Sequence, residues 1–168
     1  VLRALRGRVD GLVVMAPDLE AQQVCMAMHP VVPVALLNPC DDARFLVTID
    51  NYGGAVAMMR HLSGLGHRRI AFIKGPERNS DAAERLRAYR NTMRSLAPRS
   101  LGTIEADGEF TEASGYSAAR RLISMRERPS AIFAANDAMA IGALRALRQM
   151  DVHVPEQMAL AGFDDIPM

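Results

Sequence analysis

The stretch SAIFAANDAMAIGALRALRQM, residues 130–150, joins a short apolar run to an amphipathic run. Residues 130–135 carry no charge, which is typical of a strand that is covered on both faces of a sheet. Ile141, Leu144 and Leu147 then recur at three-residue spacing, which indicates one buried face of a helix. Asp137 stands where the N-cap of that helix is expected. The stretch therefore predicts a strand that is followed directly by a helix.

The same alternation of apolar and amphipathic runs continues along the whole chain. Further strands are expected at residues 11–15, 33–37, 45–49, 69–73, 101–106 and 158–163. Further helices are expected from residue 18 to 29, from 51 to 66, from 80 to 98 and from 111 to 123, with caps at Asp50 or Asn51, at Ser80 or Asp81, and at Thr111. Apolar strands that alternate with helices predict an α/β fold with doubly wound parallel sheets.

The composition is that of a globular protein, and it argues against several other classes. The 168 residues are 49% hydrophobic and 23% charged, which supplies enough apolar material for a core. The net charge of +1 argues against a dedicated nucleic-acid surface in this segment. No apolar run reaches the roughly 20 residues that a membrane helix needs. We therefore expect no membrane partner.

The residues that usually carry chemistry are sparse. Cys25 and Cys40 are too few for a disulfide framework, and neither stands at metal-ligand spacing from a histidine. We interpret them as reduced thiols of a cytoplasmic protein, and we expect neither a metal nor a cofactor. The sequence also lacks the fingerprints of a dinucleotide site, a phosphate-binding loop and a nucleophile elbow. These observations favour a binding protein over an enzyme.

Polar residues directly follow several of the expected strands. Asn38, Lys74, Asn136 and Asp164 each come immediately after an apolar run. Ligands of open α/β sheets bind beyond the carboxyl ends of the strands, so these residues are expected to lie near a ligand. Turn and capping roles remain alternatives, and we interpret Asp165 as a turn or capping residue.

Four longer stretches, taken together, are similar to one known family. They are IDNYGGAVAMMRHLSGLGHRRIAFIKGP at residues 49–76, ERLRAYR at 84–90, GEFTEASGYSAARRL at 108–122, and residues 129–168, which begin PSAIFAAND and end ALAGFDDIPM. In this order they resemble the effector-binding domain of LacI/GalR (lactose-repressor type) transcription regulators, over residues 9–168. The resemblance implies a periplasmic-binding-protein-like fold of two subdomains. Residues 1–47 would be part of the N-terminal subdomain, and residues 48–168 most of the C-terminal one.

The chain starts with Val1 and not with methionine. Members of the resembling family have a DNA-binding headpiece before the matching region and a closing segment after the position of Met168. We therefore expect this chain to be a fragment of a longer protein.

The resemblance also implies a set of effector contacts in the cleft between the subdomains. They are Arg85, Phe110, Asn136 and Asp164, with Ser80 in an adjoining loop, and Asn38 and Met15 on the N-terminal side. A polyol suits this chemistry, because the guanidinium donates a fork of hydrogen bonds, the carboxylate accepts them and the amide does both. An aromatic face accommodates the carbon side of a sugar ring, or a purine. The resemblance implies no catalytic residue.

Some of these residues have alternative interpretations or depart from the family pattern. Arg85 as a solvated helix residue is one alternative, and Phe110 as a hydrophobic staple ahead of the Thr111 cap is another. Asn38 stands where several members have an aspartate, and Met15 stands where the lactose-type pattern has a polar residue. The departures argue against a galactoside and leave a binding role intact.

The function that the resemblance implies is effector sensing by a bacterial DNA-binding transcription regulator. A sugar or purine-like effector would close the cleft, and closure would control operator binding through a headpiece outside this chain. The resemblance also implies a homodimer, in which Ile141 and Arg145 match part of the dimer surface; core packing is the alternative for Ile141. The competing hypotheses are a periplasmic sugar-binding protein of a transporter, and an enzyme on the same fold.

Overall fold

The computed structural model of the chain describes residues 8–15, 32–37, 45–96 and 102–167. Internal contacts divide the chain into two compact units, Val1–Asp50 and Asn51–Met168. The helix expected at residues 18–29 and the predicted effector contact Asn38 lie outside the described residues.

In the unit Val1–Asp50, three short strands form a parallel sheet. They are β1 (Leu12–Val14), β2 (Val34–Leu36) and β3 (Phe45–Leu46), in the order β1-β2-β3. The backbone of Leu12 pairs with Val34, and Ala35 pairs with Phe45. β3 is shorter than the strand expected over residues 45–49, because its pairing with β2 stops at Leu46.

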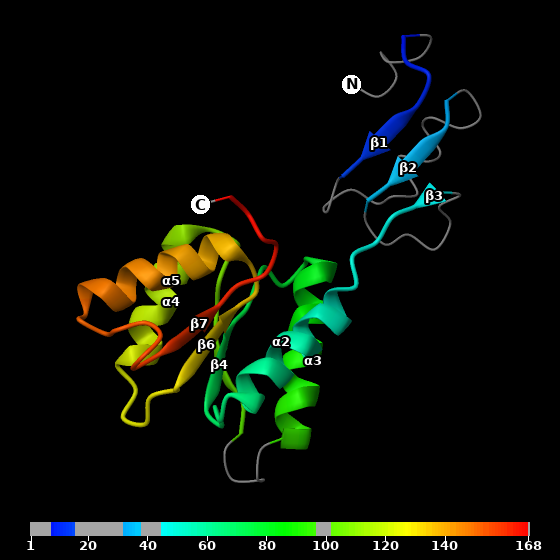
Figure 1. Cartoon of the computed structure of the whole chain (residues 1–168). Helices are drawn as coiled ribbons and strands as arrows, with labels where there is room; N and C mark the ends of the chain where they lie inside the picture. The colour runs from blue at the N-terminus through cyan, green and yellow to red at the C-terminus, as the bar shows by residue number, and fades with distance from the viewer. Residues whose placement is uncertain (1–7, 16–31, 38–44, 97–101, 168) are drawn as a thin grey trace. The chain divides into compact units, whose positions relative to one another are not determined.

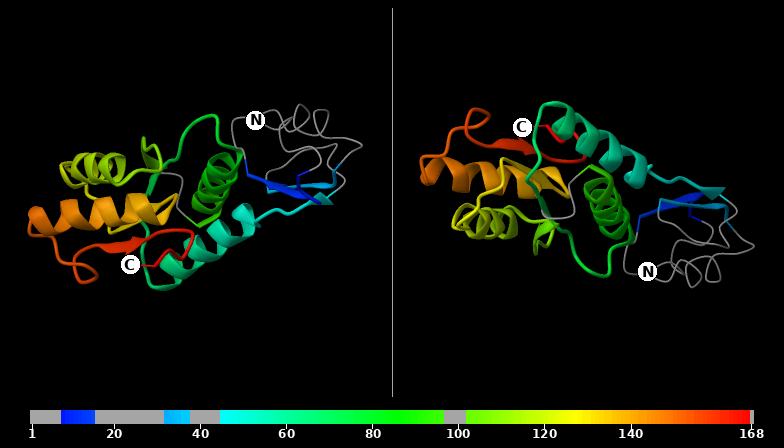
Figure 2. Two further views of the ribbon diagram at one scale, coloured as in Figure 1. Left: turned by 90° about the horizontal axis from the view of Figure 1, so that it is seen from above. Right: turned by 90° about the horizontal axis from the view of Figure 1, so that it is seen from below.

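The unit Asn51–Met168 has a central parallel sheet with helices on both faces. Its strands are β4 (Ile70–Ile73), β5 (Ile104–Ala106), β6 (Ala131–Ala134) and β7 (Ala159–Ala161), in the order β5-β4-β6-β7. Its helices are α2 (Asn51–Gly64), α3 (Ser80–Leu96), α4 (Glu112–Ile123) and α5 (Asp137–Gln149). α2 and α3 pack together on one face of the sheet, and α4 and α5 pack together on the other (Figure 1, Figure 2). The predicted doubly wound arrangement is confirmed in this unit.

The two central strands form the middle of the hydrophobic core. Every residue of β4 and β6 is buried, as expected for strands that helices cover on both faces. The ring of Phe72 in β4 stacks on Tyr89 of α3 at 5.1 Å and meets Phe133 of β6 edge-on at 5.2 Å. The Tyr89 hydroxyl accepts a hydrogen bond from the Ile104 amide at 2.8 Å, and burial raises the pKa of this tyrosine to about 12. α3 is therefore fixed to the β5 edge of the sheet by a polar contact as well as by packing.

The cap of α5 differs from the prediction. Asn136, and not Asp137, is the N-cap: its side-chain oxygen accepts from the Met139 amide at 3.0 Å, and its backbone is extended. Asp137 is the first helical residue. The prediction was wrong because the extended backbone continues one residue further past β6 than the apolar pattern indicates, and the N-cap is the last residue outside the helix.

The caps of the two preceding helices follow the same rule. At α3, Asn79 accepts from the Ala82 amide at 2.9 Å, so the predicted cap at Ser80 or Asp81 was wrong by one or two residues. At α4, Thr111 accepts from the Ser114 amide at 3.2 Å, which confirms the prediction.

α4 and α5 approach each other closely through two glycines. A Cβ atom on Gly115 would overlap the backbone of Met139, and a Cβ atom on Gly142 would overlap the carbonyl group of Glu112. Because these neighbours are backbone atoms, they cannot rotate away as a side chain does. The two glycines therefore set the distance between the helices.

Gly142→Ala is expected to lower the free energy of unfolding by about 1–3 kcal/mol, because the added methyl group forces α4 and α5 apart. Gly64→Ala is the matched control, since no atom lies within 4 Å of its Cβ position at the end of α2. It should leave stability unchanged, or raise it by up to about 1 kcal/mol. Urea denaturation followed by circular dichroism measures both variants. Equal stability of the two would contradict the close helix contact.

Candidate functional site

Arg85 of α3 is buried, with 4% of its surface exposed. Its Nε group donates to Asn51 Oδ1 at 2.8 Å, and Nη1 donates to the carbonyl oxygen of Ala135 at 2.6 Å. A solvated helix arginine, the alternative considered from sequence, is therefore wrong. Arg85 lies on the same face of α3 as Tyr89, one turn further on, which is also buried.

The segment that follows β7 completes the surroundings of this guanidinium. Nη1 of Arg85 lies 3.3 Å from Oδ1 of Asp164. The Phe163 ring covers the guanidinium plane, with 3.8 Å between its centroid and Cζ, whereas the Phe110 ring is at 6.0 Å. Such stacking of a cation on an aromatic face is favourable where water is excluded. Arg85, Phe110 and Asp164, which the sequence analysis selected together, thus form one cluster with Asn51 and Phe163.

The guanidinium of Arg85 keeps donors for a further partner. Of its five N–H groups, those on Nε and Nη1 face Asn51, Ala135 and Asp164. Nη2 makes no hydrogen bond or ion pair with another described residue. Among the described residues, no buried side-chain nitrogen or oxygen lacks a partner, so Nη2 reaches the accessible surface. The side chain therefore offers two hydrogen-bond donors from a fixed position beside the Asp164 carboxylate.

Asn136 is joined to the cluster through the backbone of Phe110. Its side-chain Nδ2 group donates to the Phe110 carbonyl oxygen at 3.3 Å, while its Oδ1 atom caps α5. One amide therefore ties the start of α5 to the residue before α4. Both polar atoms of this side chain have protein partners, so a ligand contact would use the remaining N–H of Nδ2 or the second lone pair of Oδ1.

Phe110 does not act as a hydrophobic staple. A staple packs the residue before the N-cap against the fourth residue of the helix, and with Thr111 as the cap that residue is Gly115, which has no side chain. The ring instead lies over Gly75: a Cβ atom there would be 2.5 Å from the ring and 2.8 Å from Cβ of Ala82. The backbone of Phe110 has a φ of 57°, in the left-handed region. The aromatic ring is thus placed by a glycine and by an unusual backbone conformation.

The charges around Arg85 are mainly negative. Burial raises the pKa of Asp164, Arg85 opposes this shift, and the nearby charges of Asp137 and Asp81 add to it. Burial also lowers the pKa of Arg85, against the attraction of Asp164, but the guanidinium stays protonated near neutral pH. For both partners burial is the largest single cause of the shift. Asp81 and Asp137 had been selected only as helix caps, and their effect on this cluster depends on distances that the sequence does not contain.

The other predicted contacts are not part of this cluster. Ser80 is exposed at the start of α3, and it makes none of the contacts of Arg85, Phe110, Asn136 or Asp164 given above. Met15 is 74% exposed and belongs to the unit Val1–Asp50. A ligand role for Ser80, Met15 and Asn38 stays a prediction.

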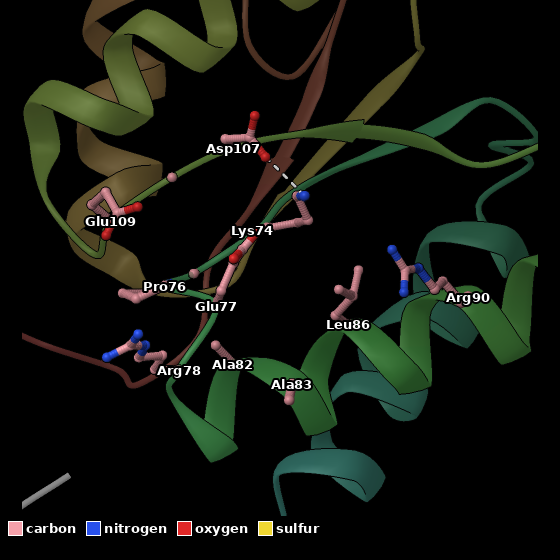
Figure 3. A pocket seen from close by; sticks show the side chains of 12 residues that line it. Lys74, Pro76, Glu77, Arg78, Ala82, Ala83, Leu86, Arg90, Asp107 and Glu109 are labelled. Carbon is pink, nitrogen blue, oxygen red and sulfur yellow. Dashed lines mark ion pairs between the residues drawn. The ribbon is translucent and has the colours of Figure 1, made fainter. Parts of the chain in front are cut away.

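A cavity of about 620 Å³ lies at the carboxyl ends of β4 and β5, beside the first turns of α3 (Figure 3). Lys74 and Asp107 form an ion pair of 2.8 Å in its lining, and Leu86 contributes an apolar surface. Gly75 and Ala82 also line it, and a Cβ atom on Gly75 would lie within 2.8 Å of both the Phe110 ring and Cβ of Ala82. Lys74, which the sequence analysis expected to lie near a ligand, lines this cavity, whereas Arg85, Phe110, Asn136, Asp164, Ser80 and Met15 do not. Through Gly75 the cavity adjoins the Phe110 ring of the Arg85 cluster.

Among the described residues, no group of three or more histidine, cysteine, aspartate or glutamate side chains could hold a metal ion. No helix in the same part of the chain combines the length and the apolar character needed to cross a bilayer.

Comparison with known proteins gives consistent matches. A family described as a periplasmic binding protein-like domain matches residues 59–168. The ribose operon repressor of Escherichia coli is 34% identical over 167 residues, which cover 98% of this chain and 51% of that protein. A LacI-family regulatory protein from Chloroflexus aggregans is 32% identical with a TM-score of 0.83, over 99% of this chain and 61% of that one. The lac repressor dimer, bound to operator and the anti-inducer ONPF, is 27% identical with a TM-score of 0.79, over 96% and 57% of the two chains.

The chain belongs to the LacI family of transcriptional regulators. It corresponds to part of the effector-binding domain of LacI-family repressors, so the predicted family and the predicted periplasmic-binding-protein-like fold are confirmed. The LacI-family relatives are named as repressors and not as enzymes. The chain spans about half the length of the curated relatives it matches.

The two bonds of Asn136 in this LacI-family chain can be separated by substitution. Asn136→Ala removes the α5 cap and is expected to lower the free energy of unfolding by about 1 kcal/mol. Asn136→Ser keeps a capping oxygen and loses the bond to Phe110, so it should cost less than half as much. The shift of the urea midpoint measures both. If serine were as damaging as alanine, the bond to Phe110 and not the cap would be the main contribution.

Proposed function

We propose that this chain is the effector-sensing part of a bacterial DNA-binding regulator and that its effector is a neutral polyol, with a sugar as the first candidate. The observation that carries the proposal is the buried Arg85 beside the carboxylate of Asp164, with Nε and Nη1 held by protein partners and Nη2 left for a ligand. A donor pair next to an acceptor matches two neighbouring hydroxyl groups of a ligand. The Phe110 ring supplies a flat apolar surface for the carbon face of a sugar, or for a purine.

The charge around the cluster favours a neutral ligand over an anion. Asp81, Asp137 and Asp164 act on the single guanidinium of Arg85. A phosphate or carboxylate on the ligand would meet three negative charges and one positive charge on this side of the site. The name of the ribose operon repressor makes D-ribose the first sugar to test.

The same proposal extends to the architecture and the partners of the whole protein. Residues 1–47 would be part of the N-terminal subdomain and residues 48–168 most of the C-terminal one. Ser80, Asn38 and Met15 would complete the site, and cleft closure would change operator binding by a headpiece outside this chain. A cytoplasmic homodimer, with Ile141 and Arg145 of α5 near its interface, is part of the proposal. The dimeric lac repressor on its operator supports it by similarity.

Arg85→Lys and Asp164→Asn are each expected to weaken sugar binding at least about tenfold, because each removes a charge-assisted or forked hydrogen bond. Arg90→Lys is the matched control on α3, since this exposed arginine pairs with Glu105 at 2.8 Å and lies outside the cluster. Thermal-shift titration of the full-length protein with a panel of sugars and purines, D-ribose first, gives the affinities. If the best ligand binds both cluster variants as tightly as the unchanged protein, the proposed site is wrong.

Sugar affinity is also expected to depend on pH through Asp164. Only the ionised carboxylate accepts from two hydroxyls, so affinity is complete above the pKa of Asp164 and is lost as the pH falls through it. Burial raises this pKa, so the loss begins at a higher pH than it would for an ordinary aspartate. Calorimetric titration between about pH 4 and pH 8 measures the effect, with Asp164→Asn as the control that should show a smaller dependence. A constant affinity in the unchanged protein over this range would contradict the role of Asp164.

A further inference from the structure

The side chain of Asn51 accepts a hydrogen bond from Nε of Arg85, and Asn51 is also the first residue after the boundary between the two units. We infer that Asn51 is the positioning residue of the effector-binding arginine and links the state of that arginine to the connection between the units. The inference rests on the proposed function in so far as it assigns effector binding to Arg85.

The hydrogen bond between Arg85 and Asn51 is buried on both sides. Asn51 is 6% exposed and Arg85 4%, and the Nε to Oδ1 distance is 2.8 Å. Leaving the Nε group unpaired in such a place costs about 1–3 kcal/mol, and more for a charged donor. A movement of Arg85 must therefore either carry Asn51 with it or break a bond that water cannot easily replace.

The bond to Asn51 also decides where the free donors of Arg85 point. A guanidinium is planar and rigid, so two bonds in its plane fix the direction of all its N–H groups. Nε is held by Asn51, and Nη1 is held by the carbonyl oxygen of Ala135. The direction of Nη2, which is the group left for a ligand, follows from these two contacts. Ala135 contributes a backbone atom, so Asn51 is the partner whose side chain can be exchanged.

The first turn of α2 holds the guanidinium in a second way. Gly54 lies one turn after Asn51, and a Cβ atom on it would be 3.0 Å from Cε2 of Phe163. Phe163 in turn covers the Arg85 plane at 3.8 Å. The start of α2 therefore restrains Arg85 in two ways. Asn51 accepts a hydrogen bond in the plane of the guanidinium, and Gly54 lies against the Phe163 ring that stacks on that plane.

The chain itself makes the link to the connection between the units. Asn51 is bonded directly to Asp50, the last residue of the unit Val1–Asp50. Consecutive Cα atoms stay about 3.8 Å apart, so a shift of Asn51 must be taken up by Asp50 or by the backbone torsions between them. A ligand that displaces Nη2 can therefore change the backbone conformation at Asp50 and Asn51, where the units join. Such a change is a requirement of control by hinge closure.

Two substitutions of Asn51 separate the hydrogen bond from simple packing. Asn51→Leu has a similar size and no acceptor, whereas Asn51→Asp keeps an acceptor at the same place. Solvent exchange of the Arg85 Nε proton, measured by NMR on the full-length protein without ligand, reports the bond directly, and Arg85→Lys identifies the signal. The leucine variant should exchange more than about tenfold faster, and the aspartate variant should remain protected.

Backbone hydrogen exchange tests whether a change at Arg85 alters the segment around Asn51. Arg85→Lys should increase amide exchange in a peptide covering residues 49–55, while Thr92→Val, at another buried polar residue of α3, should not. Unchanged Nε exchange in the leucine variant, or equally fast exchange in both Asn51 variants, would overturn the positioning role. Unchanged amide exchange in Arg85→Lys would overturn the link.

The amide exchange measurement is also made with D-ribose added. If D-ribose binds, it should slow amide exchange at residues 49–55 in the unchanged protein and have less effect in Asn51→Leu at equal saturation. Absence of D-ribose binding would count against that sugar as the effector and would leave the ligand-free result to decide the role of Asn51.

Discussion

The burial of one guanidinium group is the constraint on which the candidate site depends. A cation that leaves water needs its hydrogen bonds replaced, because an unpaired buried charge is strongly unfavourable. Arg85 finds partners in Asn51, in the carbonyl group of Ala135 and in Asp164, and Phe163 covers its plane. These contacts come from α2, from the end of β6 and from the segment after β7. The orientation of the ligand-facing donors is therefore a property of the whole unit and not of α3 alone.

The parallel α/β architecture brings these partners together. β6 and β7 pair in parallel, so the residues that follow them, Ala135 and Asn136 on one strand and Phe163 and Asp164 on the other, reach the same edge of the sheet. Asn136 then connects this edge to the backbone of Phe110. The glycine-mediated contact between α4 and α5 sets the distance between the starts of these helices. Core packing and site geometry are thus consequences of one set of contacts.

The sequence predicts the layers of the unit better than it predicts its polar contacts. β4 and β6 are continuous apolar runs, and the structure places them within one or two residues of their expected bounds. The caps at Asn136 and Asn79 were each missed by one or two residues, because neighbouring side chains are also good acceptors and only the backbone conformation distinguishes them. The spacing of Arg85 and Tyr89 on one face of α3 was a signal for burial of the arginine. The roles of Asn51 and Phe163 depend on tertiary contacts that no local pattern indicates.

The most direct test of this account is a crystal structure of the full-length protein with its sugar effector bound. The account predicts hydroxyl oxygens of the ligand within hydrogen-bond distance of Arg85 Nη2 and of the Asp164 carboxylate. It also predicts that the Nε atom of Arg85 remains about 2.8 Å from Asn51 Oδ1. A ligand bound without contact to Arg85 and Asp164, or an Arg85 side chain turned away from Asn51 toward solvent, would contradict it.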